Sequence, residues 1–335
     1  MALPHLEVYG GIRRFLELGR VWIERGHDVA IGSPGSPARP WLPFTGRIVA
    51  LEAFRSGGWD ALLSPDPALF LATEAPGALR VFYAVLEGAP GAERACRRAD
   101  LVLANSAGMR RHLGRLGVRA IDAAGAVNAA FFRPQEPDPR PMRSRAGGAV
   151  RALVYGRLSR KRKGSWSAAL ALERAARSTG VETELTLFDS PPGEETPPTL
   201  PRALSIPHRW VLNPTQEELA ALYRDADLFV SAERRAGWCN TAAEAMASGA
   251  AVVCTKSGTV DFAVDGETAA VSRWPWSWTL ARRIAPLLRD PDSRIRMAAR
   301  GRSRIAEFSW ERTADRIEAA IVSRIRGALH APVAS

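Results

Sequence analysis

Basic side chains crowd a loop that follows an apolar run in the middle of the chain. Residues 150–155 are mostly apolar, Gly156 comes next, and Arg157 and Lys163 lie in the basic stretch that follows. A loop between a strand end and a helix N-terminus is a natural site for an anion. Arg157 offers a bidentate contact to phosphate, and Lys163 adds a point charge. A solvated basic loop fits the same residues equally well.

A second candidate site spans residues 236–249, where a strand is expected to end and a helix to begin. Gly237 permits close approach of the backbone to a ligand. Asn240 or Thr241 stands at the expected cap, which directs free N–H groups outward. Glu244, one turn further, is placed to accept hydrogen bonds from a ribose diol. An ordinary capped helix with an early acidic residue accounts for the same pattern.

Two further loops carry weaker signals. Gly10 and Gly11 precede an amphipathic stretch and suit a turn that approaches phosphate, although a plain turn explains them too. The full fingerprint G-x-G-x-x-G is missing, which disfavours nicotinamide binding. Residues 257–261 follow another expected strand, where they either touch a ligand or simply connect two elements.

Several other kinds of site are not supported by residue type and spacing. None of the five histidines forms a catalytic-triad or metal-binding pattern, so no metal site is predicted. The three cysteines fit no zinc pattern and are expected to be buried, reduced thiols. Trp274, Trp276 and Trp278 alternate with other residues and are expected to pack a turn onto the core rather than to stack on a sugar.

The chain has 335 residues and a formal net charge of +11. Its length indicates two domains, and no apolar run is long enough to span a bilayer. The first ten residues do not form a secretory signal, so we expect a cytoplasmic protein. The charge favours attraction to phosphates, on a nucleotide or on an anionic membrane face. A nucleic-acid partner is not expected, because no recognition motif accompanies the charge.

Short apolar runs alternate with longer amphipathic stretches, which predicts an α/β fold with parallel sheets. Strands are expected at residues 28–32, 61–63, 79–84, 100–104, 150–155, 184–188, 228–231 and 250–254. Helices are expected at residues 11–25, 106–116, 166–179, 215–225, 241–248, 278–289, 292–308 and 310–329. Residues 134–148 are rich in proline and glycine and are interpreted as the linker between the domains.

Short motifs are spread over nearly the whole chain. They are the glycine pair with residues 24–29 (ERGHDV), residues 99–106 (ADLVLANS), Asn128 with residues 131–134 (FFRP), Gly156-Arg157 with Lys163-Gly164, residues 219–231 (LAALYRDADLFVS), residues 244–249 (EAMASG), residues 265–268 (DGET) and residues 308–310 (FSW). Together these motifs resemble those of the retaining GT-B glycosyltransferases of family 4. Each motif alone is weak, and their ordered occurrence is what carries the resemblance.

The resemblance implies two Rossmann-like domains that face each other across a cleft. Residues 1–140 would form the acceptor domain, residues 141–310 the domain for the nucleotide sugar, and residues 311–335 a helix crossing back to the first domain. It also implies transfer of a sugar, with retention of configuration and without a metal or other cofactor. The donor would be of the UDP or GDP type, and the acceptor a glycan, a glycolipid or a small molecule.

The same resemblance assigns roles to individual residues. Arg157 and Lys163 would neutralise the diphosphate leaving group, and Glu244 would hold the ribose. The donor-binding residues would be Gly10, Gly11, Gly156, Gly237, Trp238, Cys239, Asn240, Thr241 and Glu244.

The sequence departs from the family pattern in two places. A first glutamate, expected to meet the donor sugar, would stand at position 236, where this chain has Ala236; Glu233 is nearby but out of register. This motivates the alternative of a catalytically impaired relative that binds a nucleotide or a glycan. The first strand is expected to be short or missing, with only residues 6–8 to form it, as a truncated start would produce.

A peripheral contact with the inner face of the membrane is a further expectation. Arg13, Arg14 and Arg20 stand beside apolar residues on the first predicted helix. An ordinary core helix with a solvated face has the same pattern.

Overall fold

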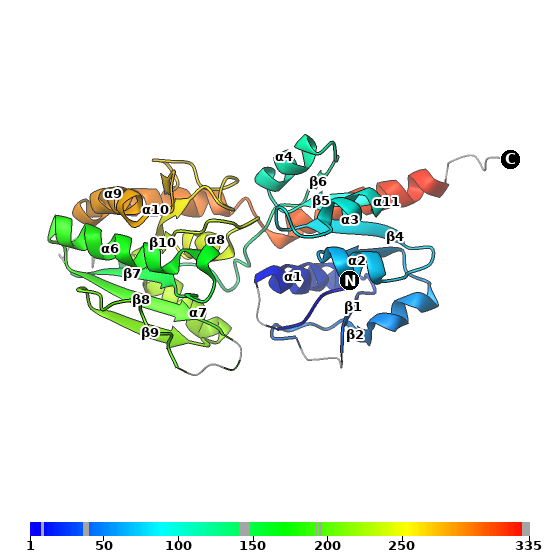
Figure 1. Cartoon of the computed structure of the whole chain (residues 1–335), viewed down its shortest axis with the longest axis horizontal. Helices are drawn as coiled ribbons and strands as arrows, with labels where there is room; N and C mark the ends of the chain where they lie inside the picture. The colour runs from blue at the N-terminus through cyan, green and yellow to red at the C-terminus, as the bar shows by residue number, and fades with distance from the viewer. Residues whose placement is uncertain (8–9, 36–39, 141–147, 192, 194–195, 330–335) are drawn as a thin grey trace. The chain divides into compact units, whose positions relative to one another are not determined.

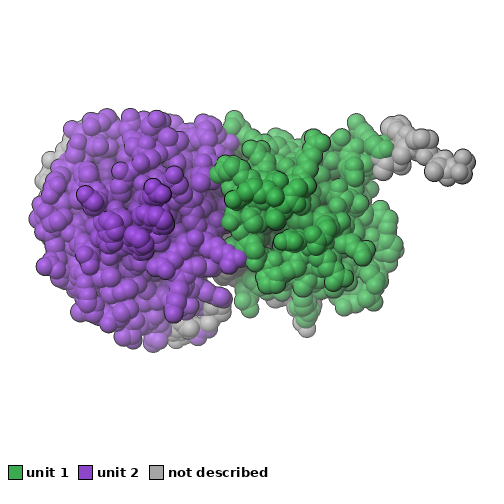
Figure 2. Space-filling view, turned by 45° about the horizontal axis from the view of Figure 1, so that its top comes forward, with its two compact units in different colours: residues 1–126, 309–335 green, residues 127–308 purple. Residues whose placement is uncertain are grey.

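The computed structural model describes residues 1–7, 10–35, 40–140, 148–191, 193 and 196–329. The chain forms two compact units (Figures 1 and 2): unit 1 comprises Met1–Ala126 and Ser309–Ser335, and unit 2 comprises Val127–Phe308. Unit 2 therefore begins at Val127, before the domain boundary expected at residue 140. Residues 141–147 of the expected linker lie outside the described residues.

Unit 1 contains short parallel strands and the helices that follow them. The strands are β1 (Ala30–Ser33), β2 (Arg47–Ala50), β3 (Ala61–Ser64), β4 (Leu79–Ala84), β5 (Leu101–Ala104) and β6 (Ile121–Asp122). The helices are α1 (Gly10–Glu24), the 3₁₀ helix η1 (Leu51–Ser56), α2 (Pro67–Ala72), α3 (Ala92–Arg98), α4 (Ala107–Arg115) and α11 (Trp310–Leu329). β1 pairs with β2, and β3 to β6 form a four-stranded sheet in chain order.

The first three residues of the chain lie between β1 and β3. The Leu3 N–H donates to Gly32 O at 2.8 Å, and the Gly32 N–H donates to Met1 O at 2.9 Å. On the other side, the Ala2 N–H donates to Leu63 O at 2.9 Å. The segment that joins the two sheets is thus Met1–Leu3 rather than the expected residues 6–8.

Helix α11 packs within unit 1, far in sequence from its neighbours. Trp310 is 2% exposed and belongs to the same apolar core as Phe15 of α1. At the surface, Arg25 donates to Asp315 at 2.7 Å and to Glu318 at 2.8 Å. These contacts hold α11 against the end of α1.

Unit 2 is built on a six-stranded parallel sheet in the order β12-β11-β10-β7-β8-β9. The strands are β7 (Val150–Tyr155), β8 (Thr183–Asp189), β9 (His208–Leu212), β10 (Leu228–Ser231), β11 (Ala251–Thr255) and β12 (Ala270–Ser272). The helices are the 3₁₀ turn η2 (Lys161–Lys163), α6 (Ser165–Thr179), α7 (Gln216–Asp225), α8 (Asn240–Ala247), α9 (Ser277–Arg289) and α10 (Pro291–Ile305). Because the strands are parallel, the loops after β7, β10 and β11 leave the sheet at the same edge.

Local sequence signals explain where several of these helices begin and end. Thr215 and Glu218 form a reciprocal capping box at the start of α7. At α10, the Asp290 side chain accepts from the Ser293 N–H at 2.9 Å, and Pro291 occupies the first turn. Among the described residues, no helix has both the length and the apolar character that crossing a bilayer requires.

Candidate functional site

Two glycines fix the path of the basic loop between β7 and α6. A Cβ on Gly156 would lie 2.4 Å from the ring of Trp210. Gly164 has a positive φ of 65°, and a Cβ there would lie 2.1 Å from Ala232 O. The loop therefore approaches the end of β10 more closely than a larger residue allows. The Arg234 N–H donates to Arg162 O at 2.7 Å, which joins the two loops directly.

Arg157 lies at the carboxyl end of β7 and is anchored to the end of β8. Its Nε donates to both carboxylate oxygens of Asp189, at 2.6 and 2.9 Å, and a terminal nitrogen donates to Ser190 O at 2.6 Å. The Arg157 side chain is 13% exposed. The ring of Tyr155 lies 5.8 Å from the Arg157 guanidinium and 5.6 Å from Lys163 Nζ. Both predicted cations therefore flank one aromatic ring.

Lys163 and Arg162 share a buried carboxylate, that of Glu233. Lys163 Nζ donates to Glu233 Oε2 at 2.7 Å, and Arg162 donates to Oε1 at 3.3 Å. The Glu233 side chain is 3% exposed, whereas Lys163 and Arg162 are 21% and 29% exposed. Burial raises the pKa of Glu233, and the charges of Lys163 and Arg162 oppose that rise. The acid that sequence reasoning set aside as out of register is thus central to the cationic group.

Helix α8 begins at Asn240, with Cys239 at the N-cap position. The Cys239 N–H donates to Gly258 O at 2.8 Å, so the loop after β11 supports the start of the helix. Burial raises the pKa of the Cys239 thiol, and the negative charge of Glu233 raises it further. Asn240 and Thr241 are partly exposed. Cys239, at the N-cap of α8, thus lies near enough to Glu233 for the carboxylate charge to act on its thiol.

Trp238 has a packing position beside this helix. Its ring lies 4.9 Å from Phe262 and 5.3 Å from Phe308, and 7% of the residue is exposed. Cys239 and the other two cysteines, Cys96 and Cys254, are buried and free, as expected from the sequence. Trp238 and Cys239 thus lie buried under the segment that leads to α8.

Glu244 lies in the second turn of α8, with 5% of the residue exposed. The hydroxyl of Tyr223, which is fully buried, donates to Glu244 Oε2 at 3.1 Å. Tyr223 itself packs edge-on against Phe132 and Phe188. An aromatic cluster therefore fixes the orientation of the Glu244 carboxylate.

Ala236 occupies the position where the family pattern has its first glutamate. The Ala236 N–H donates to Ser257 Oγ at 2.8 Å. A Cβ on Gly258, whose φ is 72°, would lie 2.8 Å from the Ala236 Cβ. The loop at residues 257–258, a weak signal in the sequence, is thus packed directly against the segment that leads to α8.

The predicted donor-binding residues of unit 1 lie at the start of α1. Gly10 and Gly11 are the first residues of that helix. Arg13 and Arg14 are only 5% and 4% exposed, and Arg14 donates to the hydroxyl of Tyr83 at 2.8 Å. The expectation that these two arginines form a membrane face is therefore wrong, because their charges are turned into unit 1.

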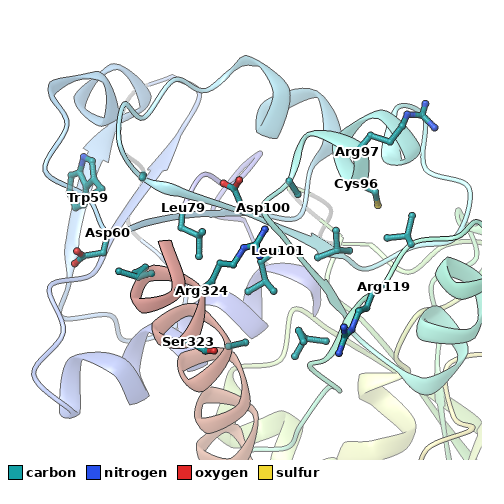
Figure 3. Close-up of a pocket in the computed structure, with 18 of the residues that line it drawn as sticks. Trp59, Asp60, Leu79, Cys96, Arg97, Asp100, Leu101, Arg119, Ser323 and Arg324 are labelled. Carbon is teal, nitrogen blue, oxygen red and sulfur yellow. The ribbon is translucent and has the colours of Figure 1, made fainter. Parts of the chain in front are cut away.

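A groove of about 1330 Å³ in unit 1 lies at the opposite edge of its sheet from the strand ends that usually bind ligands. It runs along the amino ends of β4 and β5 at Leu79 and Leu101, beside Arg324 of α11 (Figure 3). None of the predicted site residues lines it. Among the described residues, no group of three or more histidine, cysteine, aspartate or glutamate residues is placed to hold a metal ion.

Part of the chain is similar in sequence to known glycosyltransferases. Residues 143–304 match the family described as glycosyl transferases group 1. The D-inositol 3-phosphate glycosyltransferase of Segniliparus rotundus is 30% identical over 192 residues, which are 56% of this chain and 36% of that protein. Its counterpart in Corynebacterium jeikeium is 34% identical over 102 residues, which are 30% of this chain and 24% of that protein. The chain thus spans about a third or less of the length of these relatives.

Solved structures match nearly the whole chain. The sucrose-phosphate synthase of Thermosynechococcus elongatus aligns with a TM-score of 0.75 and 18% identity, covering 98% of this chain and 99% of that one. Anabaena Alr3699/HepE in complex with UDP-glucose aligns with a TM-score of 0.72 and 14% identity, covering 96% and 98%. The chain therefore has the GT-B fold, and within it residues 143–304 match the glycosyl transferases group 1 family.

Proposed function

We propose that this protein transfers a sugar from a nucleoside-diphosphate sugar to an acceptor, with retention of anomeric configuration. The observation that carries the proposal is the pairing of Lys163 and Arg162 with the buried Glu233, beside the N-terminus of α8. Both cations keep part of their surface exposed, and the helix N-terminus adds N–H donors that carry partial positive charge. Such a group suits the diphosphate of a donor better than a neutral ligand.

In this proposal, unit 2 stabilises the charge that develops on the leaving group. Lys163, Arg162 and the backbone N–H groups at Asn240 and Thr241 would receive the diphosphate oxygens. Arg157, held by Asp189, would contribute a fixed positive charge at the end of β7. Because these groups are already ordered, little reorganisation is needed when the bond to the sugar breaks.

The remaining predicted residues take supporting roles. Glu244, oriented by Tyr223, would accept hydrogen bonds from the ribose diol. Gly156 and Gly237 would allow the backbone to approach the nucleotide, and Gly10 and Gly11 would approach the phosphates from unit 1.

UDP is the nucleotide to test first, because Anabaena Alr3699/HepE, which shares this fold, was solved in complex with UDP-glucose. D-inositol 3-phosphate, named in the curated relatives, is one small-molecule acceptor to include beside glycans and glycolipids. We propose a cytoplasmic location and transfer without a metal ion, to be checked by activity in EDTA.

Calorimetric titration with UDP, GDP, ADP and dTDP tests the donor site. One nucleotide should bind saturably, and Lys163→Ala should weaken its binding about tenfold, through loss of a charge-assisted contact. Lys161→Ala is the matched control, because Lys161 is an exposed cation of the same loop. Equal binding by both variants would contradict the assignment. Product from the cognate donor should show the donor's anomeric configuration by NMR.

A second candidate function, nucleotide or glycan binding without transfer, is favoured by Ala236. No carboxylate stands at the position that the family resemblance assigns to the donor sugar, and Ser257 and Gly258 pack against that position instead. Saturable nucleotide binding without release of nucleotide from any donor, in the wild type and in Ala236→Glu alike, would select this function. Turnover by the wild type would exclude it.

A further inference from the structure

Three tryptophans of unit 2 are exposed together at the start of α9. Trp274, Trp276 and Trp278 expose 45%, 46% and 49% of their surfaces. We call these three residues the tryptophan ladder. The expectation that they pack a turn onto the core is wrong. Contiguous exposed aromatic surface usually marks a site of interaction.

The ladder is an ordered stack rather than a loose surface cluster. The rings of Trp274 and Trp276 lie 5.2 Å apart at 13°, and those of Trp276 and Trp278 lie 5.6 Å apart at 29°. The hydroxyl of Thr279 donates to the carbonyls of Trp274 and Trp276, at 2.9 and 2.8 Å, and Ser272 Oγ donates to Trp274 O at 2.8 Å. These bonds hold the turn in place, so the outward rings are built into the fold.

The stacking covers part of the ring faces and leaves ring edges exposed. Neighbouring rings cover one another's faces in part, and the guanidinium of Arg273 lies 5.4 Å from the ring of Trp274. A sugar stacks on an open aromatic face, and the faces that these rings turn toward one another are not open to it. Indole edges suit the interface of a bilayer, where the ring is buried and its N–H remains hydrated.

The surroundings of the ladder are basic. Arg273 precedes it and Arg282 follows on α9, and both residues are exposed. Arg283 pairs with Asp265, so that pair is neutral and the two other arginines leave a positive surplus. Arginines beside interfacial tryptophans are attracted to anionic lipid headgroups.

We propose that the tryptophan ladder, with Arg273 and Arg282, docks unit 2 on an anionic bilayer surface. The ladder follows β12, so it leaves the sheet at the edge where the loops after β7, β10 and β11 also leave. Docking through this edge brings the proposed nucleotide site of unit 2 to the membrane surface. The proposal concerns binding alone and does not depend on the proposed transfer reaction.

Co-sedimentation of the full chain with vesicles tests the proposal. Vesicles of phosphatidylcholine mixed with phosphatidylglycerol should bind the wild type, and vesicles of phosphatidylcholine alone should bind it more weakly. Trp274→Ser combined with Trp276→Ser and Trp278→Ser should weaken binding to the mixed vesicles at least about tenfold. Arg273→Gln should weaken it about fivefold. Brominated phosphatidylglycerol should quench part of the tryptophan fluorescence of the wild type, and this quenching should be absent in the triple variant.

Matched controls separate the ladder from general hydrophobicity and charge. Leu116→Ser removes an apolar side chain of similar exposure, 46%, from unit 1. Arg177→Gln removes an exposed arginine from α6. Both should leave vesicle binding unchanged, and titration with UDP on every variant reports the nucleotide site independently of the vesicles.

Three outcomes would overturn the proposal. The first is equal vesicle binding by the wild type and the triple variant, or none by either. The second is that the wild type binds a neutral oligosaccharide and the triple variant does not, while vesicle binding stays intact. That result would make the ladder a glycan-binding site. The third is a dimer of the wild type that the triple variant lacks in sedimentation velocity, with vesicle binding intact, which would assign the ladder to a second copy of this chain.

Discussion

At the scale of single residues, the carboxylate of Glu233 determines how the proposed diphosphate site is held. A buried charge is tolerated only when it is paired, and Glu233 is paired with both Lys163 and Arg162. The two cations are thereby kept at a fixed place before any ligand arrives. They must also exchange part of this pairing for a phosphate, so Glu233 both orders them and competes with the ligand.

Removing that competition should strengthen nucleotide binding. Glu233→Gln keeps the shape of the side chain but removes its negative charge, so we expect about tenfold tighter binding of the cognate nucleoside diphosphate. The matched control is Glu217→Gln, which changes an exposed acid on α7. Calorimetry measures both affinities, and weaker binding by Glu233→Gln would mean that ordering of the cations outweighs competition.

At the scale of elements, the sequence predicts strands with buried apolar runs and the long C-terminal helix well. Residues 79–84, 150–155, 228–231 and 310–329 form the strands and the helix expected there. Strands β2, β6, β9 and β12 and helices α2 and α3 were missed. Strands β2, β6 and β9 contain no buried residue, so no buried apolar run marks them in the sequence. Helices α2 and α3 have six and seven residues, too few to establish a helical period.

The candidate site, too, was predicted from the sequence only in part. The sequence indicated which loops matter, because each follows an apolar strand and carries a distinctive polar or glycine pattern. It did not indicate how Glu233 pairs, or that Asp189 holds Arg157, because those partners come from strands distant in sequence. It also misjudged the tryptophan ladder, since an alternating pattern does not say whether rings face the core or solvent.

The loop from β7 to α6 offers a matched test of close packing. Gly164 and Gly180 border the two ends of α6, with φ values of 65° and 69°, but only Gly164 has atoms close to an added Cβ. Gly180→Ala should cost about 1 kcal/mol of unfolding free energy for the positive φ alone. Gly164→Ala should cost at least about 2 kcal/mol more and should abolish nucleotide binding. Equal losses in chemical denaturation would argue against the close approach to Ala232.

A second prediction for α6 concerns acid stability. Glu173, on α6, accepts hydrogen bonds from Arg202 and from the Ser205 N–H, and the contact with Arg202 lowers the pKa of Glu173 from 4.5 to about 2. The unfolded chain therefore takes up this proton first as the pH falls. The stability that Glu173 contributes is complete above pH 4.5 and is lost between pH 4.5 and about 2.

Glu173→Gln should remove this part of the acid sensitivity. We expect a loss of about 1 kcal/mol at neutral pH, kept small because Arg202 is half exposed and screened by solvent. Denaturation curves of the wild type and the variant should converge as the pH falls to about 2. A constant difference across this range would contradict the assigned pKa.

At the scale of the whole molecule, unit 2 is an insertion within unit 1. The chain leaves unit 1 after Ala126 and returns at Ser309. Where unit 2 begins and ends, the Val127 N–H donates to Phe308 O at 3.0 Å, so the two ends of this unit meet. Each unit has its own buried apolar core. Separate cores predict separate cooperative transitions.

Calorimetric unfolding should therefore show two transitions. The cognate nucleotide should raise only the unfolding temperature of unit 2, because it binds the folded state of that unit. Trp310→Ala removes a buried ring from the core of unit 1. It should lower only the unfolding temperature of unit 1, through a loss of about 3–5 kcal/mol of unfolding free energy. The matched variant in unit 2 is Phe229→Ala, at a residue that is also fully buried. A single transition that responds to both substitutions would show that the units unfold together.

The position of α11 also has a consequence for biosynthesis. A ribosome delivers β1 to β6 first, but the helix that closes the core of unit 1 emerges only after all of unit 2. Unit 2 can complete its sheet while still tethered, whereas the nascent unit 1 keeps the apolar surface around Phe15 and Val21 unshielded until translation reaches Trp310 and Ile317. The first part of the protein to be made is thus the last to mature, and during that interval it is the natural client of chaperones.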